Sequence, residues 1–111
     1  MRVCHIVPSL EERHGGPSKS VRALANAEAT QGAQVELLAT LEPGQPLAAG
    51  PADAAQVRVF PRETPQWLCR SPGLAAHLTA NRADILHNHA LWLLTLRYSR
   101  NAARRHDVPL V

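Results

Sequence analysis

The sequence predicts an α/β fold with a parallel sheet and flanking helices. Short runs rich in β-branched apolar residues alternate along the chain with patterns of helical spacing. A strand, a helix and a second strand joined by short connections form a right-handed crossover, which makes the two strands parallel. With 111 residues the chain amounts to one domain at most, and a hydrophobic content of 45% is enough to build a core.

The chain begins with a predicted strand, a glycine loop and a helix. The strand is expected over residues 2–7, and Pro8 ends it because proline cannot donate to a sheet ladder. The helix is expected over residues 17–31, with Pro17 at its first position and Gly16 as its N-cap. Its free N–H groups would point into the loop and favour a phosphate or carboxylate, although glycines after a strand are also common turn residues.

An apolar stripe is expected to pack this helix against the sheet. The stripe consists of Val21, Leu24, Ala25 and Ala29, and Glu28 interrupts it. Gly32 would end the helix, and a second strand is expected over residues 35–40.

The amino-acid composition changes in the middle of the chain. Residues 42–56 are rich in proline and glycine, which indicates a surface loop without assigned chemistry. A short third strand is expected over residues 57–60, after which Trp67 and Leu68 are expected to cover the sheet edge.

Two helices and a fourth strand are expected in the last third of the chain. Ser71 as N-cap and Pro72 at the first position predict the start of one helix. The fourth strand is expected over residues 84–89, the last helix over 91–106, and a fifth strand over 107–111.

Two histidines mark the end of the fourth strand. Alternation along an extended chain places His87 and His89 on the same side, at the sheet edge that also carries Gly15 and Gly16. Ligands of open α/β sheets bind along that edge. His87 could instead be a hydrogen-bonded core residue, and a zinc site would need a third ligand, for which no plausible spacing is visible. For His89, contact with a substrate is the functional alternative.

Composition excludes several functions. The net charge is +3, but the basic residues are scattered and the aromatic content is 4%, so nucleic-acid binding is not expected. Cys4 is expected to be a small buried hydrophobe, and no disulfide framework is indicated. We expect no signal peptide at the N-terminus, and no apolar run of about 20 residues occurs in the sequence. We expect a cytoplasmic location, with association at a membrane surface as an alternative.

Several segments resemble a known family. Residues 5–10 (HIVPSL) and 14–21 (HGGPSKSV) are similar to the opening of glycosyltransferase family 4 proteins, the bacterial group 1 transferases of the GT-B fold. Residues 84–92 (DILHNHALW) resemble the Asp-hydrophobic-hydrophobic-His-x-His segment of the same family, and residues 108–111 (VPLV) resemble the strand that follows it. The resemblance covers essentially the whole chain, in order.

The resemblance implies a Rossmann-like, acceptor-side half of a two-domain GT-B enzyme. Such enzymes move a sugar from a nucleotide-sugar donor to a glycan or glycolipid acceptor with retention of configuration, in polysaccharide or glycoconjugate biosynthesis, and no metal or other cofactor is expected. By its position in the family motif, His89 is the catalytic candidate that the resemblance implies, beside the reacting sugar. The substrate-binding candidates are His87 and the glycine-loop residues Gly15, Gly16, Pro17 and Ser18.

The chain also departs from the family pattern. Glu28 and Ala33 stand where the family usually has a leucine and a histidine, at positions that are structural. The nucleotide-sugar domain, with its paired glutamates, has no counterpart in these 111 residues. We therefore expect residues 1–111 to be a partial N-terminal domain that is inactive alone.

Two alternatives stay open. A sugar-nucleotide epimerase shares the two-domain fold and would release a free or isomerised sugar. A non-catalytic, flavodoxin-like binding module would unfold cooperatively as a monomer, whereas a fragment would expose apolar surface.

Overall fold

The computed structural model describes residues 1–10, 15–44, 54–89 and 93–111. Four parallel strands form one sheet in the order β3-β2-β1-β4. The strands are β1 (Arg2–Ser9), β2 (Gln34–Leu41), β3 (Gln56–Pro61) and β4 (Ile85–Asn88). The predicted α/β fold with a Rossmann-like parallel sheet is confirmed.

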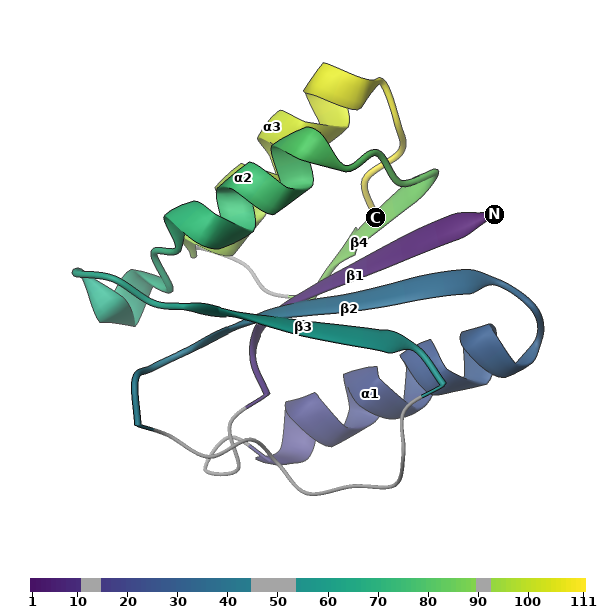
Figure 1. Ribbon diagram of the computed structural model, residues 1–111, viewed down its shortest axis with the longest axis horizontal. Helices are drawn as coiled ribbons and strands as arrows, with labels where there is room; N and C mark the ends of the chain where they lie inside the picture. The colour runs from purple at the N-terminus through teal and green to yellow at the C-terminus, as the bar shows by residue number, and fades with distance from the viewer. Residues whose placement is uncertain (11–14, 45–53, 90–92) are drawn as a thin grey trace.

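Helices cover both faces of the sheet (Figure 1). One face carries α1 (Gly15–Thr30), and the other carries α2 (Pro72–Ala80) and α3 (Leu94–His106). A short 3-10 turn, η2 (Gln66–Leu68), lies between β3 and α2. No helix among the described residues is both long and apolar enough to cross a bilayer.

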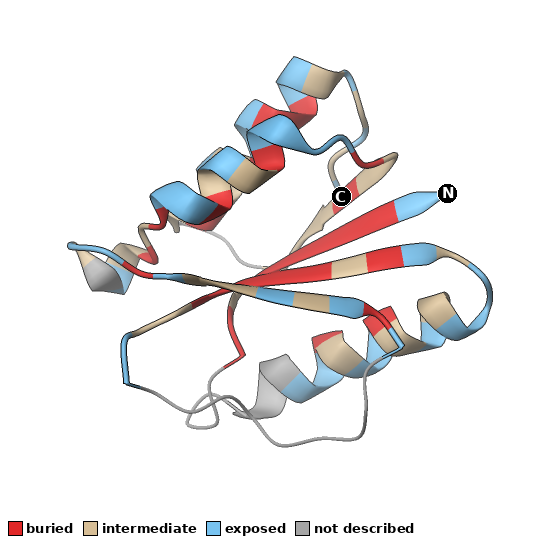
Figure 2. Cartoon of the chain, viewed as in Figure 1, coloured by how far each residue is buried: buried red, intermediate tan, exposed pale blue. Residues whose placement is uncertain are grey.

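The core is divided by the sheet into two apolar clusters, which the buried segments of Figure 2 follow. Alternation along the strands sends neighbouring side chains to opposite faces, so each strand feeds both clusters. The cluster under α1 contains Val3, Val7, Leu10, Val21, Ala25, Val35, Leu37, Ala39 and Ala55. The cluster under α2 and α3 contains Cys4, Ile6, Leu38, Leu74, Leu78, Ala83, Leu86, Ala102 and Ala103. Cys4 is thus a buried apolar residue, as predicted.

The inward face of α1 differs from the predicted stripe. Leu24 is 41% exposed, so its assignment to the stripe is wrong. An α-helix has 3.6 residues per turn, which places Val21, Ala25 and Glu28 on one face and leaves Leu24 at the flank of that face. Gly32 ends the helix with a φ of 101°, a conformation that glycine adopts without strain.

The start of α1 also lies earlier than predicted. The helix begins at Gly15 rather than Pro17, so Gly16 is in the first turn and is not the N-cap. The preceding loop residues 11–14 lie outside the described residues, as do residues 45–53 of the predicted surface loop.

The predicted start of α2 is confirmed, but the prediction for Trp67 is wrong. Ser71 is the N-cap, and its Oγ accepts a hydrogen bond from the Leu74 N–H at 3.4 Å. Trp67 is 77% exposed. It belongs to η2, which follows β3 and lies beyond the end of that strand, so the indole does not cover the sheet edge.

The end of the chain forms less sheet than predicted. The described part of the last helix begins at Leu94, and the predicted start at Leu91 lies outside the described residues. Asp107 ends α3 in the left-handed conformation, with a φ of 54°. The predicted fifth strand is reduced to one parallel bridge between Leu110 and Leu86, because this turn and Pro109, which lacks an N–H, shorten the extended run.

Candidate functional site

The order of the strands reverses between β1 and β4. From β1 the chain adds β2 and then β3 on one side, and it returns through α2 to place β4 on the other side of β1. In open α/β sheets, ligands bind outside the carboxyl ends of the strands at such a switch point. Because α1 follows β1, its first turn lies at this same edge.

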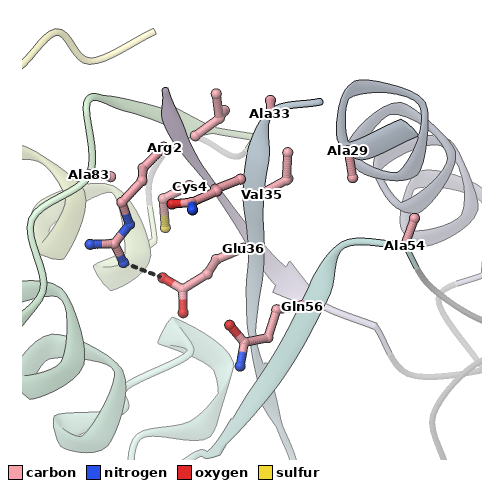
Figure 3. A pocket seen from close by; sticks show the side chains of 11 residues that line it. Arg2, Cys4, Ala29, Ala33, Val35, Glu36, Ala54, Gln56 and Ala83 are labelled. Atoms are coloured by element: carbon pink, nitrogen blue, oxygen red, sulfur yellow. Dashed lines mark ion pairs between the residues drawn. The ribbon is translucent and has the colours of Figure 1, made fainter. Parts of the chain in front are cut away.

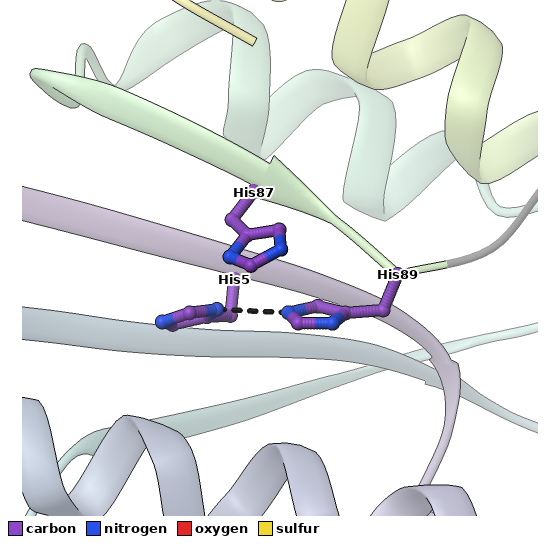
Figure 4. Close-up of side chains that lie close together, drawn as sticks. All are labelled: His5, His87 and His89. Carbon is purple, nitrogen blue, oxygen red and sulfur yellow. Dashed lines mark hydrogen bonds between the residues drawn. The ribbon is translucent and has the colours of Figure 1, made fainter. Parts of the chain in front are cut away.

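Three histidines meet at the switch point (Figure 4). The parallel register pairs His5 of β1 with His87 of β4, and His89 follows β4 by one residue. The Nδ1 atom of His5 lies 2.9 Å from Nε2 of His89. The rings of His87 and His89 are stacked, with centroids 4.0 Å apart. The predicted placement of His87 and His89 on one side is confirmed, and His5 joins them.

Glu28 of α1 contacts the histidine group from the facing helix. Its Oε1 atom lies 3.1 Å from Nε2 of His5. The His5 side chain is 0% exposed, whereas the Glu28 side chain is 31% exposed. An ionised carboxylate can only accept hydrogen bonds, so the proton of this contact belongs to Nε2 of His5.

The protein environment keeps His87 and His89 neutral at pH 7. Burial lowers the pKa of His89 to about 4, and the nearby His87 and His5 act in the same direction. Burial also lowers the pKa of His87, with His5 adding to the effect and Glu28 opposing it. A neutral imidazole offers one donor and one acceptor nitrogen, so each ring can hold a sugar hydroxyl or a phosphate oxygen. His87 is only partly buried, so it is not the core residue that the sequence left as an alternative.

The histidine group supplies the third potential metal ligand that the sequence did not reveal. One ring nitrogen from each of His5, His87 and His89 lies within 4.8 Å of the others. The ring of His89 is stacked on that of His87, with 25° between their planes, whereas His5 is tilted at 41° to His87 and meets His89 through the contact between Nδ1 and Nε2. The nitrogens of His5 and His89 therefore face each other rather than a common point at which tetrahedral zinc would lie. The described arrangement is a hydrogen-bonded histidine pair with a third histidine stacked on it.

The predicted glycine segment forms the first turn of α1. Gly15, Gly16, Pro17 and Ser18 all lie within the helix, at the carboxyl edge of the sheet. The first N–H groups of a helix have no partner within the helix, and the first turn of α1 contains no acidic residue. The side chains of this turn lie outside the described residues.

A buried arginine holds the carboxyl ends of the strands together. The Nε group of Arg62 donates to Oγ1 of Thr40 at 2.7 Å, and Nη2 donates to the Pro8 carbonyl at 3.1 Å. The Thr40 hydroxyl also donates to the Pro8 carbonyl. The register between β1 and β2 shifts between Val7 and Ser9, so these side chains satisfy a carbonyl at the irregularity.

A hollow of about 440 Å³ opens at the opposite edge of the sheet (Figure 3). Arg2, Gln34, Glu36 and Gln56 contribute its larger polar side chains. The Glu36 carboxylate lies 3.8 Å from Nη2 of Arg2 and 3.1 Å from Nε of Arg58, so its charge is balanced within the protein. This hollow lies at the amino ends of β1 and β2, away from the switch point, and we assign the functional site to the histidines.

Comparison with known proteins identifies a family. Residues 15–111 match the model of a family described as a glycosyl transferase 4-like domain. The matched region contains Glu28, His87 and His89. No curated protein and no solved structure matches the chain significantly.

Proposed function

The chain belongs to the glycosyl transferase 4-like domain family, and on that basis we propose that it is the acceptor-side part of a retaining glycosyltransferase. The reaction moves a sugar from a nucleotide-sugar donor to a glycan or glycolipid acceptor, in the synthesis of polysaccharide or another glycoconjugate. A second domain would hold most of the donor, so residues 1–111 alone would not complete the transfer.

The observation that carries the proposal is the position of two neutral histidines at the switch point. His89 and His87 lie side by side at the carboxyl edge, with ring centroids 4.0 Å apart. Glycosyl transfer requires groups that orient hydroxyls and stabilise charge near the bond that breaks, and neutral imidazoles can do both without a metal. In this proposal His89 contacts the reacting sugar and His87 binds the substrate beside it.

The first turn of α1 would bind the charged part of the substrate. The first turn of α1 carries N–H groups at Gly15, Gly16 and Ser18, with Pro17 between them, and it begins a helix of 16 residues whose dipole favours an anion. A diphosphate placed there would have its sugar directed along the same sheet edge as the histidines. No metal or other cofactor enters this scheme.

Product analysis with the complete transferase tests the proposal. The protein is incubated with a panel of nucleotide-sugars and with glycan and glycolipid acceptors, and products are identified by mass spectrometry and NMR. We expect a new glycosidic bond with the anomeric configuration of the donor. His89→Ala should lower kcat by about 100-fold, in the range of a lost acid–base or positioning group.

A matched variant and the alternative products complete the test. His106→Gln changes a histidine in the last turn of α3, away from the site, and should retain full activity. Equal rates in His89→Ala and the unsubstituted protein would reject the role of His89. A free or isomerised sugar would identify an epimerase, and binding without turnover by the complete protein would identify a binding module.

A further inference from the structure

We propose that Glu28 and His5 form a positioning pair that fixes the tautomer and orientation of His89. The three side chains form one line of contacts, from Oε1 of Glu28 to Nε2 of His5 at 3.1 Å and from Nδ1 of His5 to Nε2 of His89 at 2.9 Å. That His89 acts on a sugar rests on the function proposed above. The positions of the protons on Glu28, His5 and His89 do not depend on that function.

The carboxylate determines where the protons lie. A neutral imidazole has one N–H, and the ionised Glu28 takes the Nε2–H of His5 as its donor. The Nδ1 atom of His5 then has only a lone pair, so it accepts the Nε2–H of His89. His89 is left with an unprotonated Nδ1, which can accept a hydrogen bond from a substrate hydroxyl. The opposite tautomer of His5 would place a lone pair against the carboxylate, which is repulsive.

The same three side chains can also transfer a proton. When Nδ1 of His89 accepts a proton from a hydroxyl, the Nε2 proton of His89 can pass to Nδ1 of His5. His89 is then neutral again, and the positive charge lies on His5 next to the Glu28 carboxylate. The hydroxyl oxygen keeps the electron pair of its broken O–H bond and forms the new glycosidic bond with it. The bond between the sugar and the diphosphate breaks, and its electron pair leaves on the nucleotide diphosphate.

Burial explains why His5 requires an acceptor on α1. The His5 side chain is 0% exposed, and a buried ring needs a partner for each of its polar nitrogens. Glu28 satisfies one nitrogen and His89 satisfies the other. Glu28 itself shares the inward face of α1 with the buried Val21 and Ala25, where a carboxylate without a partner would be costly.

Nitrogen NMR of the 111-residue chain tests the positioning pair without any substrate. Long-range ¹⁵N–¹H correlation spectra show which nitrogen of each histidine carries the proton. We expect a protonated Nε2 and an unprotonated Nδ1 for His89, at neutral pH. The preference should be about tenfold or more, because a net contribution of about 1.4 kcal/mol from a hydrogen bond to a charged group corresponds to a factor of ten.

Two variants separate the carboxylate from the volume it fills. Glu28→Gln keeps the volume of the side chain but can offer His5 either an acceptor oxygen or an NH2 donor, so the tautomer preference of His89 should fall only part of the way. Glu28→Leu fills the space without an acceptor, so the tautomer preference of His89 should fall to about threefold or less. His106, whose Nε2 lies 3.1 Å from the Leu78 carbonyl, is the internal reference and should keep its tautomer in both variants. Glu63→Gln, in an exposed ion pair with Arg70, is the matched charge control.

Three results would overturn the proposal. The first is an Nδ1–H tautomer of His89 in the unsubstituted chain, which needs no variant to fold. The second is an unchanged His89 tautomer in a folded Glu28→Leu chain. The third is stoichiometric binding of added Zn²⁺ that shifts the ring nitrogens of His5, His87 and His89 together, since this would identify a metal centre.

An activity measurement distinguishes this inference from the proposed function. In the complete transferase, Glu28→Leu should lower kcat about tenfold with little change in the KM of the donor, and Glu28→Gln should have a smaller effect in the same direction. The expected tautomers without any transfer activity would leave the positioning pair in place and reject the transferase. Transfer activity together with an Nδ1–H tautomer of His89 would support the transferase and reject the positioning pair.

Discussion

Oε1 of Glu28 lies 3.1 Å from Nε2 of His5, across the interface between α1 and the sheet. The neighbouring contacts of this interface are apolar, and both Val21 and Ala25 of α1 are buried against it. The contact therefore links the docking of α1 to the orientation of the histidines at the switch point. A residue that interrupts the apolar stripe in the sequence is a polar connection in the folded protein.

Glu28→Ala should lower the free energy of unfolding by about 1–2 kcal/mol. The substitution leaves the buried Nε2–H of His5 without its acceptor, and a buried donor without a partner has a cost of this size. Urea denaturation monitored by circular dichroism measures the change. Glu63→Ala removes an exposed carboxylate 3.7 Å from Arg70 and should cost less than about 0.5 kcal/mol. Equal losses in the two variants would contradict a specific contact between Glu28 and His5.

The stability of the chain should fall as the pH is lowered from neutrality. His89 has a pKa of about 4 in the folded protein against 6.5 as the ordinary value, and the pKa of His87 is lowered in the same direction. Between these two pH values the unfolded chain binds more protons than the folded chain, so the free energy of unfolding decreases as pH falls through this window. Below the folded pKa of His89 this residue contributes no further loss.

Denaturation curves measured at intervals from pH 7 to pH 4 test this effect of His89 on stability. In His89→Gln the free energy of unfolding should depend less steeply on pH. The pKa of Asp84 is lowered from its ordinary 3.8, first by the Arg2 backbone N–H that donates to its carboxylate. Its contribution is present above pH 3.8 and is lost only as pH falls through the lower folded value. A pH dependence unchanged by His89→Gln would show that this histidine is not the group that titrates.

The sequence was sufficient to predict the parallel sheet and the side on which His87 and His89 lie, because both follow from local patterns. Alternation within one strand places His87 and His89 together regardless of how the strands pair. The Ser71 cap likewise depends on neighbouring residues alone, and it is confirmed.

The contacts of His5 and Glu28 could not be predicted in the same way. His5 meets His87 only because β4 pairs with β1, between residues 82 positions apart, and the sequence patterns do not state which strands are neighbours. In the sequence, Glu28 interrupts the apolar stripe of α1. The stripe is defined by apolar residues alone, so it cannot show that a carboxylate has its partner on another element. The signal available was the position of Glu28, since 3.6 residues per turn place it nearer the centre of the α1 face than Leu24.

Cys4 should be unreactive in the folded protein. Burial raises the pKa of its thiol to about 12, with Glu36 acting in the same direction, so almost no thiolate is present at pH 8. Cys69 is also buried, and both cysteines are free. We expect no modification of Cys4 by iodoacetamide in native buffer and complete modification in denaturant, as measured by mass spectrometry. Modification at similar rates in both conditions would show that β1 is open to solvent.

Arg62→Ala should be among the most destabilising single substitutions in the chain, at about 2–4 kcal/mol. Arg62 is 9% exposed and donates to Thr40 Oγ1 at 2.7 Å and to the Pro8 carbonyl at 3.1 Å. Its removal leaves polar groups with fewer partners at the point where the ends of β1 and β2 meet. Arg70→Ala is the matched control, because Arg70 bonds the Thr64 carbonyl from an exposed position and should cost below about 1 kcal/mol. Thermal and urea denaturation of the two variants compare the losses, and a similar small loss in both would mean that Arg62 does not hold the carboxyl edge of the sheet together.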